Sequence, residues 1–356
     1  MEIHKKIRIK DIAERAGVSV GTVDRVIHGR DNVSAISMER VRKVLDEINF
    51  TPNHYASALA SNKEYKFAAI LPMHEVDSYW ARVEAGLKDG VRRFSDFNIN
   101  FKIFRYDPFN DESFKIECQN LIDSNPEYVI IGPIFHYNIM AGFTDQLNER
   151  NIPYALLDSN WPEFNHQIFY GQDSLRSGAF SGRIMSLTVD KDTEKIALFK
   201  LMGEGRVASR QQMNREVGFR KYMEEHCPNI EIVELILYAY DKKGMHERMY
   251  EFFKNNPDIR HGLSFNSSIH VIADFLRKEM PEHPHVTLLG YDAVDRNVEC
   301  IKNGSADFLI AQHPQDQGLN CFRSMFNKCV LKMTIPRDHY MAIELLTREN
   351  IDYYKD

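Results

Sequence analysis

The chain has 356 residues, of which 43% are hydrophobic and 27% are charged, a composition typical of water-soluble globular proteins. This length can hold one small domain and a larger one with a sizeable core. The first ten residues lack the apolar stretch of a secretion signal, and no run approaches about 18 consecutive apolar residues, so we expect a cytoplasmic protein without a membrane span.

The net charge of −6 is unevenly distributed along the chain. Residues 1–66 carry twelve Lys or Arg against nine Asp or Glu, which leaves −9 for the rest. The basic excess favours contact between the N-terminal segment and nucleic acid, whereas the acidic remainder is not expected to bind nucleic acid by itself. The five cysteines include no Cys-x-x-Cys pair, which favours reduced thiols over disulfides or a metal site.

Residues 7–59 predict three short amphipathic helices followed by one further element. Ile12 and Ala13 give the first helix an apolar side, and Gly17 stands where a left-handed residue would end it. Ser19 can cap a second helix, in which the apolar residues follow the helical period. Two helices joined by a short turn around a glycine form a helix-turn-helix, whose second helix enters the DNA major groove.

A third helix follows, capped by Ser34 or Ser37. Its apolar face is made of Val41, Val44, Leu45 and Ile48. The three helices can close a small core, although helical bundles that never touch nucleic acid share this pattern. The segment that comes next, after Thr51 and Pro52, carries further information.

The N-terminal region resembles the lac repressor (LacI-type) family of transcriptional regulators. The stretches KDIAERAGVS, GTVDRVI and TPNHYASAL stand in the family's order and spacing. The resemblance implies that residues 53–59 form a hinge helix, whose Leu59 enters the minor groove as an apolar wedge and kinks a base step. The DNA contacts that it implies are Ser19, Val20, Gly21, Thr22, Arg25, Asn53, Ala56 and Leu59.

The chain departs from the family at the positions that read bases. Val20 and Gly21 cannot donate a hydrogen bond from a side chain, whereas Arg25 suits guanine O6 and N7. Val20 can contact a thymine methyl group, so we expect a half-site that contains both G and T. Asp24 replaces the family's usual serine, and it can either accept from a cytosine N4 or pair with Arg25.

From Phe67 onward, short apolar runs alternate with amphipathic segments, which indicates a doubly wound α/β arrangement with parallel sheets. The strand-like runs are FAAILP, FKIFRY, YVIIG, PYALLD and IFYG, and then KIALFK, IVELILY, GLSFN, HVTLLG and DFLIA. Two subdomains are favoured over one wide sheet, because twisted sheets rarely exceed about ten strands. This region resembles the type I periplasmic binding proteins and the effector domain of the family just named.

The resemblance also implies the domain boundaries. A helix-turn-helix head with its hinge helix covers residues 1–60, a linker covers 61–66, and an effector-binding domain covers 67–356. The N-subdomain would comprise about 67–172 and 313–341, and the C-subdomain about 173–312 and 342–356, with crossings near Gln172, Gln312 and Met341.

Ligands of open α/β sheets bind beyond the carboxyl ends of the strands. The residues at those ends that match sugar-contacting positions in the ribose-type members of the fold are Asp77, Tyr79, Trp80, Asp158, Arg215, Tyr240, Asn266, Asp292 and Gln312. A sugar needs this mixture, since its C–H faces stack on aromatic rings and its hydroxyls bind carboxylates, arginine and amides. Alternatively, Asp158 or Asp292 caps the next helix and Trp80 belongs to the core.

The charge balance of these residues restricts the ligand class. Ribose-type proteins follow the first-half aspartate with an arginine, whereas Ser159 and Asn160 follow Asp158 here. The remaining set is acidic, because three aspartates face the single cation Arg215. We therefore expect a neutral sugar or polyol and not a sugar phosphate.

Signals for catalysis or a cofactor are weak. Residues 203–208 fit the dinucleotide pattern G-x-G-x-x-A after a strand, but Glu224 and Glu225, about 20 positions on, lie in a helical stretch and not at a strand end. The chain has no G-x-S-x-G elbow, in which the serine would stand on a strand-to-helix turn, and no H-E-x-x-H motif. We expect no enzyme activity, no cofactor and no bound metal.

The residue patterns and the resemblance together predict a homodimeric transcription regulator, a repressor, that binds a near-palindromic operator under allosteric control by a neutral sugar or polyol. The residues after Ile351 show no apolar heptads, so a dimer is expected and not a coiled-coil tetramer. The alternative is a cytosolic sugar receptor or sensor with a degenerate DNA-binding head.

Overall fold

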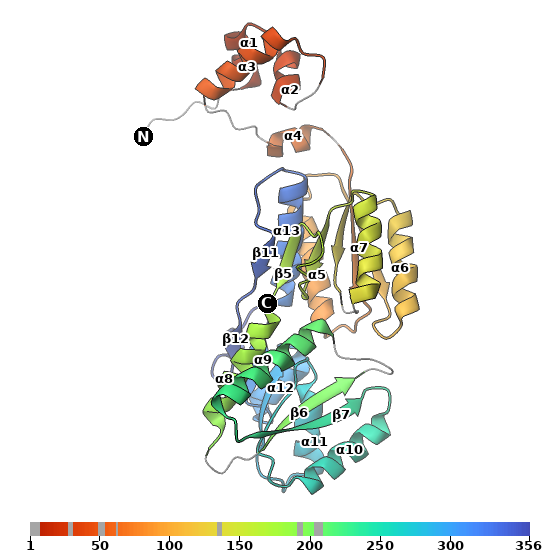
Figure 1. The fold of residues 1–356 in the computed structure, drawn as a ribbon, viewed down its shortest axis with the longest axis vertical. Helices are drawn as coiled ribbons and strands as arrows, with labels where there is room; N and C mark the ends of the chain where they lie inside the picture. Colours follow the sequence, from red (N-terminus) through yellow and green to blue (C-terminus); the bar gives the residue numbers. More distant parts are fainter. Residues whose placement is uncertain are drawn as a thin grey trace. The chain divides into compact units, whose positions relative to one another are not determined.

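The computed structural model describes residues 8–27, 31–48, 54–61, 63–133, 137–190, 195–202 and 209–356 (Figure 1). The chain divides into two compact units, Met1–Ser61 and Asn62–Asp356. We call the first unit the head and the second the body. Among the described residues, no helix is both long enough and apolar enough to cross a membrane.

The described residues of the head form four helices. They are α1 (Ile9–Ala16), α2 (Val20–Ile27), α3 (Ala35–Glu47) and α4 (His54–Ala60). Gly17 ends α1 in the left-handed region with φ +64°, as the sequence predicts. Ser34, and not Ser37, caps α3 by accepting the backbone N–H of Ser37 at 3.2 Å. The buried core joins the first three helices through Ile12, Ala13, Ala16, Val23, Val41 and Val44.

Within its described ranges, the body has two six-stranded sheets. The first has the order β11-β5-β4-β3-β1-β2, and every pair in it is parallel. Its strands are β1 (Tyr65–Pro72), β2 (Ile99–Tyr106), β3 (Tyr128–Ile131), β4 (Tyr154–Leu157), β5 (Ile168–Gly171) and β11 (Asp338–Tyr340). Its helices are α5 (Tyr79–Arg93), α6 (Asp111–Asp123), α7 (Tyr137–Glu149) and α13 (Pro314–Cys329).

Helices cover both faces of the first sheet. Alternate residues of each strand point to opposite faces, and because both sets are apolar, each face packs against helices. Phe67 of β1 packs on Phe322 of α13, with ring centroids 4.9 Å apart. The next residue, Ala68, lies in a core cluster with Phe114 of α6 and Met140 of α7. Strands that are buried on both faces account for the continuous apolar runs in the sequence.

The second sheet has the order β12-β10-β9-β8-β6-β7, and only β12 is antiparallel to its neighbour. Its strands are β6 (Lys195–Met202), β7 (Glu231–Tyr238), β8 (His261–Leu263), β9 (Thr287–Tyr291), β10 (Phe308–Ala311) and β12 (Glu344–Leu346). Its helices are α8 (Ser174–Thr188), α9 (Arg210–His226), α10 (Lys242–Asn255), α11 (Ile269–Glu279) and α12 (Asp295–Asn303), and the short 3-10 helix Ile351–Tyr353 follows β12. This two-sheet α/β architecture with a helical head confirms the predicted fold class.

The chain passes between the two sheets three times, after β5, after β10 and after β11. Gln172, which follows β5, links all three connections. Its side-chain Nε2 donates to the carbonyl oxygen of Ala311 at 2.7 Å and to that of Ala342 at 2.8 Å. The three connections are therefore held together by one buried amide.

Two short β-strands were absent from the sequence prediction. β11 and β12 are three residues long and contain no continuous apolar run. Each adopts a strand conformation because it pairs with the last strand of a sheet, β11 with β5 and β12 with β10. The five cysteines are all free thiols.

Candidate functional site

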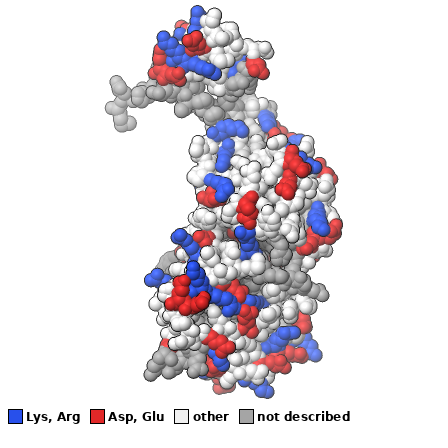
Figure 2. All heavy atoms as spheres, viewed as in Figure 1, with Lys and Arg blue, Asp and Glu red and all other residues white. Residues whose placement is uncertain are grey.

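The head exposes one side of α2. Val23 is fully buried, whereas Ser19, Val20, Gly21 and Arg25 are exposed. The hydroxyl of Ser19 accepts the backbone N–H of Thr22 at 3.1 Å, so Ser19 begins the helix as its sequence predicts. Basic side chains lie next to acidic ones on the visible face of the head (Figure 2).

The remaining predicted DNA contacts lie in or near α4. Leu59 is 44% exposed. Asn53 lies outside the described residues, as does the side chain of Ala56. An exposed leucine on a short helix is available to a partner surface, but its insertion between bases stays a prediction.

A cavity of about 400 Å³ lies between the two sheets of the body, beyond the carboxyl ends of their strands. Both subdomains contribute to its lining. Seven predicted residues line it, namely Tyr79, Trp80, Asp158, Arg215, Asn266, Asp292 and Gln312. The structure therefore brings side chains that are far apart in the sequence into one site, and their contact with a ligand stays a prediction.

Two aspartates occupy equivalent positions in the two halves. Asp158 follows β4 with φ +69°, and Asp292 follows β9 with φ +67°. Both are only 5% exposed. A non-glycine residue in the left-handed region is strained by about 1–3 kcal/mol, and such strain concentrates at functional sites. The backbone thus turns each carboxylate into the cavity at a cost in stability.

Arg215 of α9 is the buried cation of the site. Its Nη1 donates to the carbonyl oxygen of Phe265 at 2.8 Å, and its Nη2 donates to Gln312 Oε1 at 2.5 Å. Its guanidinium lies 4.0 Å from the centre of the Tyr291 ring. Gln312 in turn donates through Nε2 to Asp292 Oδ1 at 2.6 Å, which connects the cation to the carboxylate through one amide.

Close helix packing positions Arg215. On α8, a Cβ at Gly178 would overlap the backbone carbonyl of Arg215. On α9, a Cβ at Gly218 would overlap the carbonyl of Leu175. The two glycines let the backbones approach so closely that Arg215 reaches the cavity from a rigid helix pair.

Burial sets the protonation of the cavity. It raises the pKa of Asp292 to about 6, although Arg215 lowers that pKa, and it also raises the pKa of Asp158. Burial, with the charges of the two aspartates, raises the pKa of the Tyr79 phenol well above its usual value. Tyr79 therefore stays protonated and donates to Gln317 Oε1 at 3.0 Å.

Two predicted residues do not line the cavity. The Asp77 carboxylate accepts the backbone N–H of Asp295, at 3.1 Å and 3.0 Å from its two oxygens. Asp77 follows β1 by five residues, and its carboxylate is bound to the start of α12, although its neighbours Ser78 and Tyr79 line the cavity. Tyr240 is 58% exposed and follows the edge strand β7, where its neighbour Ala239 reaches the cavity instead.

Sequence reasoning missed other polar residues of the cavity. Gln211 precedes Arg215 by one helical turn and donates to Gln312 Oε1 at 3.1 Å. The i, i+4 spacing from Arg215 could have placed Gln211 on the same helix face. His74, Ser78 and Ser209 also line the cavity, but they lie outside regular elements and carry no periodic signal.

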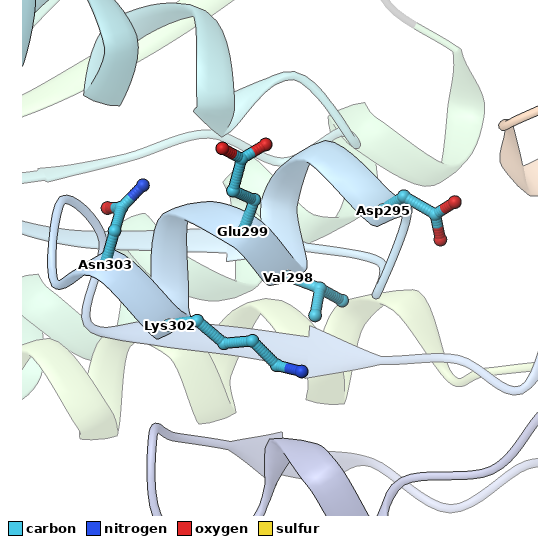
Figure 3. Close-up of a pocket in the computed structure, with 5 residues that line it drawn as sticks. All are labelled: Asp295, Val298, Glu299, Lys302 and Asn303. Carbon is cyan, nitrogen blue, oxygen red and sulfur yellow. The ribbon is translucent and has the colours of Figure 1, made fainter.

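A second concavity runs along α12 (Figure 3). The residues that line it are Asp295, Val298, Glu299, Lys302 and Asn303. They belong to one helix, and Lys302 forms an ion pair with Asp352 at 2.6 Å. We regard it as a surface groove, because no second element contributes a wall among the residues that the structure describes.

Metal and dinucleotide binding find no support in the part of the chain that the structure describes. Among the described residues, no group of three or more His, Cys, Asp or Glu side chains could hold a metal ion. Residues 203–208, which carry the G-x-G-x-x-A pattern, lie outside the described ranges. Glu224 and Glu225 lie within α9, which is not the strand-end position that a ribose-binding acid needs.

Comparison with known proteins places the two units in recognised families. The model of the lacI family of bacterial regulatory proteins matches residues 8–53, and that of a periplasmic binding protein domain matches residues 67–330. A crystal structure assigned to the LacI transcriptional regulators, from Bacteroides fragilis, is 38% identical with a TM-score of 0.78. It covers 82% of this chain, and this chain covers all of it.

Other relatives are more distant or match over shorter stretches. A solute-binding protein from Burkholderia graminis in complex with D-arabinose shares the fold at 14% identity, with a TM-score of 0.72 over 82% of this chain and 98% of its own. Catabolite control protein A is 34% identical over 28% of this chain in Streptococcus mutans and 28% identical over 43% in Staphylococcus xylosus. These matches span 29% and 44% of those relatives.

Proposed function

Because this chain belongs to the LacI family of bacterial regulatory proteins, we propose that it is a transcription regulator, acting as a repressor, whose operator affinity is controlled by a neutral sugar or polyol. The observation that carries the proposal is the cavity between the two sheets, which is lined by the buried residues Asp158, Asp292 and Arg215. It occurs in the same chain as a helix-turn-helix with an exposed second helix.

The cavity suits a polyhydroxylated ligand. Two carboxylates and the amides of Asn266 and Gln312 supply acceptors and donors for adjacent hydroxyls, and Trp80 supplies an aromatic surface. An anionic ligand would meet both aspartates, while two nitrogens of Arg215 already bind protein oxygens. These charges support the neutral class.

The head supports DNA binding by its exposed α2 face. Arg25 would read guanine, and Val20 would contact a thymine methyl group. One head reads few bases, so the proposal includes a homodimer on a near-palindromic operator, in the cytoplasm where the DNA lies. Leu59 of each α4 would enter the minor groove at the centre of the operator.

The proposal assigns the cavity to binding and not to catalysis. Its central polar groups bond one another, since Gln312 bonds both Arg215 and Asp292. Ligand binding would change the arrangement of the two subdomains, and this change would alter the conformation of the hinge helix α4 and its fit to DNA. Such coupling is reciprocal and typically amounts to about 1–3 kcal/mol.

A thermal-shift screen tests the ligand class. The panel contains pentoses, hexoses, sugar acids and polyols, together with their phosphates. A ligand at about 100 times its dissociation constant should stabilise the protein by about 2.7 kcal/mol. Stabilisation by a sugar phosphate but not by the parent sugar would overturn the neutral class.

Operator binding then tests regulation. With a sugar from the screen, DNA affinity is measured in the presence and absence of that sugar, and sugar affinity in the presence and absence of operator. Equal sugar affinity in both conditions would contradict the coupling. Continued incubation with the sugar should yield no product, as a binding site requires.

A sugar receptor with a degenerate head is the second candidate. The observation that favours it is the pair Val20 and Gly21 on the exposed face of α2, since neither side chain can donate a hydrogen bond to a base. Weak DNA binding without sequence preference, together with tight sugar binding, would favour this candidate.

A further inference from the structure

Helix α12 of the second subdomain is capped by a residue of the first. Its N-cap residue is Val294, which offers no side-chain cap. Asp77, in the loop between β1 and α5, accepts the backbone N–H of Asp295 with both carboxylate oxygens, at 3.1 and 3.0 Å. Figure 3 shows Asp295 at the start of this helix. A carboxylate at a helix N-terminus satisfies an otherwise unpaired N–H and interacts favourably with the helix dipole.

A second cap runs in the opposite direction. Asp356 follows the 3-10 helix of the second subdomain, and its Oδ1 accepts the backbone N–H of Gln315 at 2.9 Å. Gln315 lies in the first turn of α13, which belongs to the first subdomain and whose N-cap residue His313 makes no side-chain cap bond. Each subdomain therefore supplies a carboxylate cap for a helix of the other.

Arg82 joins the two caps. It projects from α5, and its Nη2 lies 3.1 Å from Asp295 Oδ1 and 3.7 Å from Asp77 Oδ1. Its Nη1 lies 3.8 Å from Asp356 Oδ2. One guanidinium thus lies within 4 Å of three carboxylates that the caps bring together, two of them from the second subdomain, and its charge reduces the repulsion among them.

We propose that Asp77, Arg82, Asp295 and Asp356 form a clasp that favours the closed cleft and thereby sets effector affinity without contacting the effector. None of the four is among the described residues that line the cavity, although Ser78 and Tyr79, next to Asp77, do line it. Opening the cleft separates Asp77 from α12 and leaves the N–H of Asp295 without its protein acceptor. The effect on affinity rests on the proposed function, whereas the clasp itself is measurable without any effector.

Hydrogen exchange of the full ligand-free chain tests the clasp, with Asp77→Ala as the main variant. We expect faster exchange in the first turn of α12 and also in cavity-lining segments near residues 209–212 and 265–268. Arg82→Ala should accelerate the same cavity segments, and Asp77→Asn, which keeps an oxygen acceptor, should partly restore protection.

Asp241→Ala is the matched control. Asp241 caps α10 by accepting the N–H of Gly244 at 2.8 Å, and both residues belong to the second subdomain. This variant should accelerate exchange at the start of α10 only. Two results would refute the clasp. If Asp77→Ala accelerated exchange only at the start of α12, Asp77 would be a local helix cap. If exchange were unchanged everywhere, Asp77 would make no stabilising contact.

Effector binding supplies the second readout, with the sugar that the screen identifies as the probe. We expect Asp77→Ala to raise its dissociation rate about tenfold, because the removed cap bonds are made only in the closed form, and Asp241→Ala to leave it unchanged. Unchanged exchange and unchanged sugar kinetics would refute the clasp and leave the proposed function intact. If no sugar bound any variant, the proposed function would fail, while the exchange comparison would still decide on the clasp.

Discussion

Asp292 is predicted to oppose folding at neutral pH. Its carboxyl is 5% exposed, and burial raises its pKa from 3.8 to about 6. Because the folded state binds this proton more tightly than the unfolded state, the associated stability is present below about pH 4 and is lost as the pH rises through about 6. The loss above that pH amounts to about 3 kcal/mol.

The Asp292→Asn variant removes this titration. Asparagine keeps an oxygen that can accept from Gln312 Nε2, as Asp292 does at 2.6 Å. The difference in unfolding free energy between the variant and the wild type should grow in favour of the variant by about 1–2 kcal/mol as the pH rises from 5 to 8. Urea denaturation at several pH values measures the difference, and Asp96→Asn, at an exposed position, should show no such change.

The same variant should bind an effector sugar more weakly. A hydrogen bond to a charged group contributes about 1.5–3 kcal/mol, so affinity should fall by about one to two orders of magnitude. A difference in stability that does not vary with pH would refute the reasoning, since it would mean that Asp292 titrates alike in the folded and unfolded states. A stabilised variant with unchanged sugar affinity would show that Asp292 faces the cavity without a binding role.

Three further predictions concern packing, the connections and DNA. Gly178→Ala should destabilise the protein by about 1–3 kcal/mol, because the added methyl group would overlap the Arg215 backbone. Gly142→Ala, which has open space around the new methyl group, should stabilise α7 by about 0.5–1 kcal/mol. Thermal unfolding of the two variants measures both changes. Gln172→Ala should cost about 1–3 kcal/mol in denaturant unfolding, since it leaves two carbonyls of the other connections without its amide, and an unchanged midpoint would contradict that role. Arg25→Ala should lower affinity for the operator by about 1–3 kcal/mol more than for unrelated DNA, and an equal loss on all sequences would identify Arg25 as a phosphate contact.

Most elements of the fold could be predicted because their signals are local. The buried parallel strands β1 and β6 appear as continuous apolar runs, since both faces of each sheet are covered by helices. Gly17 marks the end of α1 through its left-handed conformation. β11 and β12 could not be predicted, because three residues without an apolar pattern become strands only at the edge of an existing sheet.

The candidate site divides in the same way. The rule that ligands bind beyond the carboxyl ends of strands indicated Asp158 and Asp292 from the sequence, and the resemblance to the ribose-type proteins added Arg215. The structure places all three around one cavity. The strand-end rule could not distinguish the aspartates that line the cavity from Asp77 and Tyr240, which also follow strands but do not line it. The path of each loop and the position of its strand in the sheet decide which side chains reach the cavity.

Local sequence patterns specify the helical head, the alternation of strands and helices and the chemical character of the strand ends, because these features depend on neighbours within a few residues. Other features are visible only in the folded protein: Asp77 caps a helix of the opposite subdomain, Gln172 joins three connections, and Arg215 lines one cavity with two strained aspartates. Such contacts join residues far apart in the chain, and the hydrogen bonds and burial that define them exist only once the two sheets have packed.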